Sequence, residues 1–144
     1  MITEDYVSFE TAKLLKEKGF DAECHSHYYP CHYPDGSIEY HRDKSAQSRT
    51  KIWYNVYSLK NLPKDHYLAP TIQMAMKWLR ETHDFNVNTE LNIHGYFCSL
   101  SHIVRDLSGH IIDIEDSEAW ETAYYDSYEQ AVESAVKYCL ENLI

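Results

Sequence analysis

The chain has 144 residues, of which 44% are hydrophobic and 25% are charged, and its formal net charge at pH 7 is −10. This composition is typical of a globular protein and excludes a disordered chain, and the length predicts a single domain over residues 1–144. The negative charge repels phosphate backbones, so we expect no direct binding to nucleic acid.

The sequence carries no pattern typical of export or of membrane insertion. Glu4 and Asp5 lie where a secretory signal carries Lys or Arg, and no window approaches the roughly 18 apolar residues that a spanning helix needs. We therefore expect a cytoplasmic protein that does not bind membranes. Because thiols stay reduced in the cytoplasm, the cysteines are expected to be free: Cys24, Cys31, Cys98 and Cys139.

Residues 1–66 contain one predicted helix and three predicted strands. The helix starts after Ser8, whose hydroxyl suits a helix N-cap, and it ends at Gly19, which permits a left-handed cap. Pro34-Asp35-Gly36 predicts a tight turn between the first two strands, and an exposed loop precedes the third strand. The strands are expected at residues 24–33, 37–41 and 52–57.

Residues 67–144 predict the order helix, strand, strand, strand, helix. Pro70 opens a helix with an apolar stripe that reaches Leu79, and Ser127 with Gln130 forms a capping box for the last helix. An antiparallel meander is expected from strands at residues 85–94, 96–104 and 110–114. The fold class is therefore α+β, with a mostly antiparallel sheet, or two small sheets, packed against three helices. The similar order of elements in residues 1–66 and 67–144 indicates a weak internal duplication.

The order of elements in the second half is also that of a double-stranded-RNA-binding domain. That module needs cations where it meets phosphate groups. Here the last helix begins near Asp126 and Glu129. The order of elements therefore does not predict that this chain binds double-stranded RNA.

Three segments of the chain are similar to the same family of proteins: Tyr6 to Phe20, Ala69 to Glu81, and Tyr125 to Ala131. They resemble a family of short uncharacterised proteins from gut Bacteroidales, their prophages and mobile elements. That family has no assigned activity. The resemblance implies a bacterial or phage cytoplasmic protein and transfers no catalytic residue.

The first predicted hairpin contains a group of potential metal ligands. His25, His27, Cys31 and His41 carry the imidazole and thiolate groups that zinc and other transition metals prefer. The spacing lacks the paired C-x₂-C arrangement of a structural zinc site, and a strand at this place would point Cys24 away from the others. Solvated or stacked histidines are the simpler interpretation, and metal binding by these four residues is the alternative.

An acidic segment in the second half carries most of the net charge. Between Arg105 and Lys137 there is no Lys or Arg, whereas nine Asp or Glu residues lie there. A solvated loop and helix explain this segment most simply. The interleaved aromatic residues also suit a contact surface for a basic protein, or a surface that imitates nucleic-acid phosphate. The candidate contact residues are Trp120, Glu121, Tyr124, Tyr125 and Tyr128.

No arrangement of residues in the sequence predicts catalysis or a bound cofactor. Cys98 and His102 lie four apart on a predicted strand, which separates them by about 13 Å and prevents proton transfer. There is no nucleophile elbow, P-loop or dinucleotide-binding motif. We therefore expect a non-catalytic interaction or accessory protein that binds a protein partner and self-associates.

Overall fold

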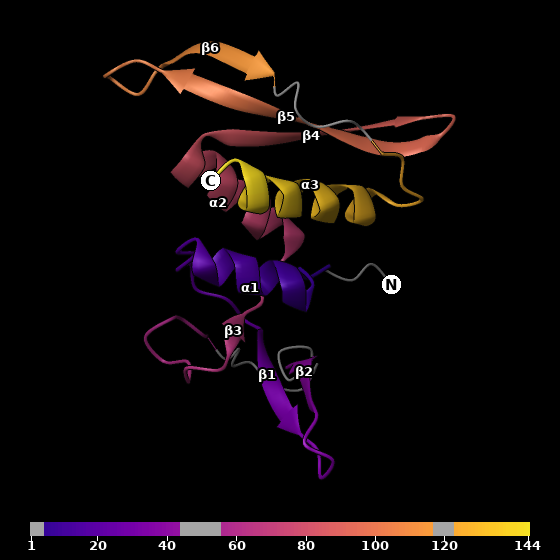
Figure 1. Ribbon diagram of the computed structural model, residues 1–144. Helices are drawn as coiled ribbons and strands as arrows, with labels where there is room; N and C mark the ends of the chain where they lie inside the picture. Colours follow the sequence, from indigo (N-terminus) through magenta and orange to yellow (C-terminus); the bar gives the residue numbers. More distant parts are fainter. Residues whose placement is uncertain (1–4, 44–55, 117–122) are drawn as a thin grey trace, which may run out of the picture. The chain divides into compact units, whose positions relative to one another are not determined.

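The computed structural model describes residues 5–43, 56–116 and 123–144. The described residues form three helices and two three-stranded antiparallel sheets, which confirms the predicted α+β class (Figure 1). The chain divides into two compact units, Met1–Thr71 and Ile72–Ile144. Among the described residues, no helix has the length and apolar character needed to cross a membrane.

The first unit contains one helix and a sheet in the order β2-β1-β3: α1 (Phe9–Glu17), β1 (His27–His32), β2 (Ile38–Arg42) and β3 (Tyr67–Leu68). Ser8 caps α1 as predicted, because its Oγ accepts the N–H of Thr11 at 3.3 Å. At the other end Gly19 adopts a φ of 88°, and the N–H of Phe20 donates to the carbonyl of Leu15 at 2.9 Å. This arrangement is a Schellman ending, and it buries Phe20 against the end of the helix.

The predicted hairpin turn lies between β1 and β2. Gly36 has a φ of 85°, and its N–H donates to the carbonyl of Tyr33 at 3.0 Å. The sequence did not predict β3, which is only two residues long and therefore has no visible alternation. The predicted strand at residues 52–57 lies mostly outside the described residues, and within them Tyr57 forms a single bridge with Cys24.

Aromatic rings join α1 to one face of the first sheet. The ring of Phe9 stacks on Tyr40 with centroids 4.1 Å apart, and it contacts Tyr28 at 5.7 Å and Tyr67 at 5.3 Å. These three tyrosines come from β2, β1 and β3. The hydroxyl of Tyr28 also donates to the carbonyl of Val7 at 2.6 Å. Phe9 therefore ties the helix to all three strands.

The second unit has the predicted order of elements and a meander sheet: α2 (Ile72–His83), β4 (Phe85–Asn92), β5 (Gly95–Arg105), β6 (Ile111–Asp116) and α3 (Tyr128–Asn142). Figure 1 shows α2 and α3 on the same side of this sheet. Ser127 caps α3 as predicted, since its Oγ accepts the N–H of Gln130 at 3.2 Å. The buried residues of α3 follow the predicted apolar stripe: Ala131, Val132, Ala135, Val136, Cys139 and Leu140.

The segment before α3 is attached to the start of β5. Tyr96 and Tyr125 exchange two main-chain hydrogen bonds of 2.9 and 2.8 Å. Gly95, with a φ of 127°, lies directly against the carbonyl oxygen of Tyr125. A side chain at this position would meet that oxygen, so the close approach requires glycine.

The alternation of β4 predicts one buried face, and only its first half is buried. Val87 is buried, whereas Leu91 is 64% exposed and Ile93, in the turn after β4, is 96% exposed. Residues of β5 opposite the first half, such as Leu100, are also buried. Exposure therefore increases along β4 toward the turn, a change that the regular alternation of the sequence does not predict.

Candidate functional site

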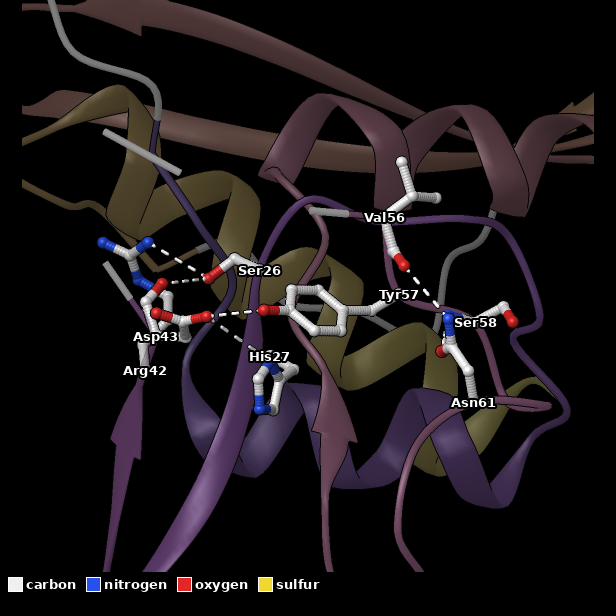
Figure 2. Close-up of polar contacts among 8 residues, drawn as sticks. All are labelled: Ser26, His27, Arg42, Asp43, Val56, Tyr57, Ser58 and Asn61. Carbon is white, nitrogen blue, oxygen red and sulfur yellow. Dashed lines mark hydrogen bonds and ion pairs between the residues drawn. The ribbon is translucent and has the colours of Figure 1, made fainter. Parts of the chain in front are cut away.

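A cluster of polar residues in the first unit is centred on Asp43, which directly follows β2. The hydroxyl of Tyr57 donates to Asp43 Oδ2 at 2.7 Å, and His27 Nδ1 lies 3.9 Å from the same oxygen (Figure 2). The main chain fixes Asp43 as well, because its N–H donates to the carbonyl of His27 at 2.8 Å. Ser26 Oγ donates to the carbonyl of Asp43 at 2.8 Å. Asp43 is thus held in one position from several directions.

The segment that carries Tyr57 is held by its own contacts. Tyr57 and Cys24 exchange main-chain hydrogen bonds of 2.7 and 2.9 Å. The side chain of Asn61 donates to the carbonyl of Val56 at 3.1 Å and accepts the N–H of Ser58 at 2.7 Å, as Figure 2 shows. These contacts place the Tyr57 hydroxyl beside Asp43.

His27 is packed between rings, and its side chain is 11% exposed. It lies 4.2 Å from the ring of Tyr57 and stacks on His66 with centroids 5.2 Å apart. Burial lowers the pKa of His27 below its ordinary value, Asp43 opposes this shift, and His66 adds to it. The Nδ1 atoms of His27 and His66 have no hydrogen-bond partner within the described residues. The environment therefore favours a neutral, packed imidazole at His27.

We expect the stability of the first unit to fall as the pH drops below about 6.5, the ordinary pKa of histidine in an unfolded chain. Because the folded pKa of His27 is lowered, the unfolded state takes up a proton that the folded state does not, until the pH passes below the folded pKa. Urea unfolding at a series of pH values measures the effect. His27→Phe should make the curve flatter in this range, and an unchanged curve would contradict the assignment.

Three of the four thiols of the chain are shifted away from activation as nucleophiles. All four cysteines are free, and three of them are buried. Burial raises the pKa of Cys24 and of Cys139 to about 12, and it also raises the pKa of Cys98. A reactive cysteine needs the opposite shift. These three residues therefore act as apolar core groups.

The structure places the four predicted metal ligands along the first sheet and does not bring them to one point. His25 precedes β1 and is exposed, whereas His27 and Cys31 lie four residues apart on β1. His41 lies on β2 opposite Tyr29, whose ring is 6.0 Å from His27 and 6.4 Å from His41. Within the described residues, no group of three or more His, Cys, Asp or Glu is placed to hold a metal ion. Metal binding by these residues stays a prediction.

His41 takes part in a different contact at the exposed end of the hairpin. Its Nε2 lies 3.4 Å from Glu39 Oε2 and 3.4 Å from the hydroxyl of Tyr33. That hydroxyl donates to the same oxygen of Glu39 at 3.1 Å. His41 thus contacts a carboxylate and a tyrosine hydroxyl at this end of the hairpin, whereas His27 packs against rings at the other end of β1.

Of the predicted contact residues in the second unit, Trp120 and Glu121 lie outside the described residues. Tyr125 and Tyr128 take part in internal contacts: Tyr125 shares a hydrogen bond of 2.6 Å with Ser134, and Tyr128 packs edge to face near Tyr96. Tyr124 is 50% exposed. Its ring lies 5.7 Å from Phe97 and 5.4 Å from His94, next to the turn between β4 and β5. Of the three predicted contact residues that the structure describes, Tyr124 is the exposed one.

Sequence reasoning missed an exposed apolar surface of the second unit. All six residues of β6 are exposed, including three isoleucines. The sequence predicted a strand at this place but contained no signal that it lies at the edge of the sheet. We define the β6 surface as the side chains of this strand: Ile111, Ile112, Asp113, Ile114, Glu115 and Asp116.

Charge is distributed unequally between the two units. Residues 1–71 contain nine Lys or Arg against ten Asp or Glu, whereas residues 72–144 contain four against thirteen. The second unit therefore carries −9 of the formal net charge of −10. No family model, curated protein or solved structure matches the chain.

Proposed function

We propose that the chain is a non-catalytic interaction protein of the cytoplasm and that its second unit contacts a basic protein. The observation that carries this proposal is the β6 surface, where isoleucine side chains that would normally be buried are exposed among carboxylates. Contiguous exposed apolar residues often indicate an interaction site on a folded protein. Their acidic neighbours favour a partner that offers both apolar and positively charged groups.

A second exposed group lies at the turn between β4 and β5. Leu91 and Ile93 are exposed there, and Tyr124 packs beside Phe97 with half of its surface open. Tyrosine is enriched among the residues that dominate binding energy in interfaces. We propose Tyr124 as a second anchor residue for the partner, near the start of β5, whereas β6 pairs with the end of β5 from Ser101 to Arg105.

The charge of the second unit supports a basic partner in another way. Thirteen acidic residues against four basic ones create a negative field around residues 72–144. Such a field raises the rate of association with a positive protein, and salt weakens it. The proposal therefore includes binding that weakens as the salt concentration rises.

Selection from a random peptide display library against the purified chain tests this proposal. We expect the selected peptides to be rich in Lys or Arg together with apolar residues. Ile114→Ser and Tyr124→Ala should each raise the Kd of the tightest peptide by about tenfold, the effect of truncating an interface anchor.

The chain offers a matched control for this experiment. Ile38 is 50% exposed on the edge strand β2 of the first unit, compared with 59% for Ile114 on β6. Ile38→Ser should leave the Kd unchanged. Selection of acidic or neutral peptides, or an equal loss of affinity in Ile38→Ser, would contradict the proposed surface.

A further inference from the structure

We infer that the partner binds β6 by strand addition and that the bound segment is an extended strand in which Lys or Arg alternates with apolar residues. This inference rests on the proposed function and names the binding mode and the class of partner. In strand addition, main-chain hydrogen bonds supply affinity and alternate side chains supply specificity. The open edge of β6 provides the main-chain groups, and the charge pattern of β6 provides the specificity.

The edge of β6 that faces away from β5 has no strand beside it in the part of the chain that the structure describes. The direction of its main-chain groups follows from the pairing of β5. The N–H of Ile103 donates toward β4, to the carbonyl of Asp84 at 2.7 Å. Ile114 lies opposite Ile103, so the N–H and carbonyl of Ile114 point away from β5 in an antiparallel ladder. Both groups therefore lie on the edge along which an added strand would pair.

In the free protein a side chain occupies this outward donor. The N–H of Ile114 donates to Asp113 Oδ1 at 2.8 Å. A carboxylate on an edge strand also discourages pairing with other chains. Asp113 therefore provides a hydrogen-bond acceptor for the N–H of Ile114 in the absence of a partner. When a strand binds, a basic residue opposite Asp113 would draw the carboxylate away from this N–H.

The charge pattern favours a basic strand over a second copy of the chain. Asp113 and Glu115 lie on one side of β6, since side chains alternate along a strand. In a symmetric antiparallel pair that places Ile114 opposite Ile114 of a second copy, Asp113 faces Glu115. If Ile114 instead lies opposite Ile112, Asp113 faces Asp113. Like charges directly opposite each other destabilise a sheet, whereas Lys or Arg at these positions stabilises it.

A synthetic ten-residue peptide of alternating Lys and Val is the probe, used with the full chain at about 0.15 M salt, where surface charges are partly screened. An apolar residue opposite Ile114 directs its own N–H toward β6. N-methylation of the Val amides should therefore weaken binding by at least about tenfold, because it removes the hydrogen bonds of the new ladder. N-methylation of the Lys amides should leave the Kd nearly unchanged, because those groups point to the other side.

A variant of the chain tests the same ladder from the other side. Ile114→Pro removes the outward N–H and no donor used by β5, and proline is tolerated on edge strands in this orientation. We expect an unchanged circular dichroism spectrum and at least about tenfold weaker binding of the Lys-Val peptide. Ile114→Ser removes the same apolar side chain but keeps the N–H, so the affinity that Ile114→Pro loses beyond the loss in Ile114→Ser measures the main-chain hydrogen bond.

The outcomes distinguish this inference from the proposed function. If both N-methylated peptides bind equally well, strand addition is wrong, while contact with a basic partner stands. If the Lys-Val peptide does not bind, the inference is wrong, and the display selection decides the proposed function separately. If the chain forms dimers in sedimentation experiments that Ile114→Pro abolishes, a second copy occupies the edge and the basic strand is rejected.

Discussion

Gly95→Ala is expected to lower the free energy of unfolding of the second unit by about 3 kcal/mol or more. Two effects add at this position. The φ of 127° is a conformation that residues with a side chain rarely adopt. A Cβ atom there would lie 2.6 Å from the carbonyl oxygen of Tyr125, a main-chain atom that cannot rotate away. That oxygen accepts the N–H of Tyr96, so its displacement also strains the attachment of the segment before α3.

Urea unfolding monitored by circular dichroism measures this change, and hydrogen exchange of the β4 and β5 amides assigns it to the second unit. Gly109→Ala is the matched control, because Gly109 also has a positive φ of 87° but has no atom within 4 Å of an added Cβ. It should cost only the conformational strain, about 1 kcal/mol. Equal destabilisation by the two substitutions would show that the contact with Tyr125 carries no energy of its own.

Phe9→Ala is expected to destabilise the first unit by about 3 kcal/mol, because it removes a ring that contacts a tyrosine on each strand of the sheet. The value lies at the lower end of the range for aromatic truncation, since Phe9 is partly exposed. The loss should appear as a lower urea midpoint. Near-ultraviolet circular dichroism should change as well, because the tyrosine rings lose their fixed neighbour.

Phe9→Leu separates apolar bulk from ring geometry at this position. Leucine retains much of the buried area but cannot stack on Tyr40, so about 1 kcal/mol of the loss should remain. Full stability in Phe9→Ala would mean that the tyrosines of the sheet pack without the helix. That result would contradict the assignment of Phe9 as the residue that ties α1 to the three strands.

Only some features of the exposed surface of the second unit could be predicted from the sequence. The acidic, tyrosine-bearing segment was visible because charge and residue type can be read directly from the sequence, and Tyr124 is exposed as a contact residue requires. Tyr125 and Tyr128 have the same residue type and nearly the same place in the chain. Their internal contacts with Ser134 and Tyr96 depend on folding, so the sequence could not separate them from Tyr124.

The cluster around Asp43 was beyond sequence reasoning for a related reason. His27, Asp43, Tyr57 and His66 are separated by intervals of nine to sixteen residues in the chain. The pairing of β1 with β2 and β3 and the bridge between Cys24 and Tyr57 bring them together. The reverse holds for the predicted metal ligands. Their proximity in the sequence suggested one site, but the spacing of residues along β1 and β2 distributes them over the sheet.

The sequence by itself determined the elements whose ends depend on local chemistry. Ser8 and Ser127 cap their helices, and Gly19 and Gly36 adopt the left-handed conformations that end α1 and turn the first hairpin. The tertiary structure alone decided which strand lies at an edge and which half of β4 is covered. Burial and edge position depend on contacts between residues far apart in the chain, and no local pattern records those contacts. The exposure of β6, on which the proposed function depends, is a property of this kind.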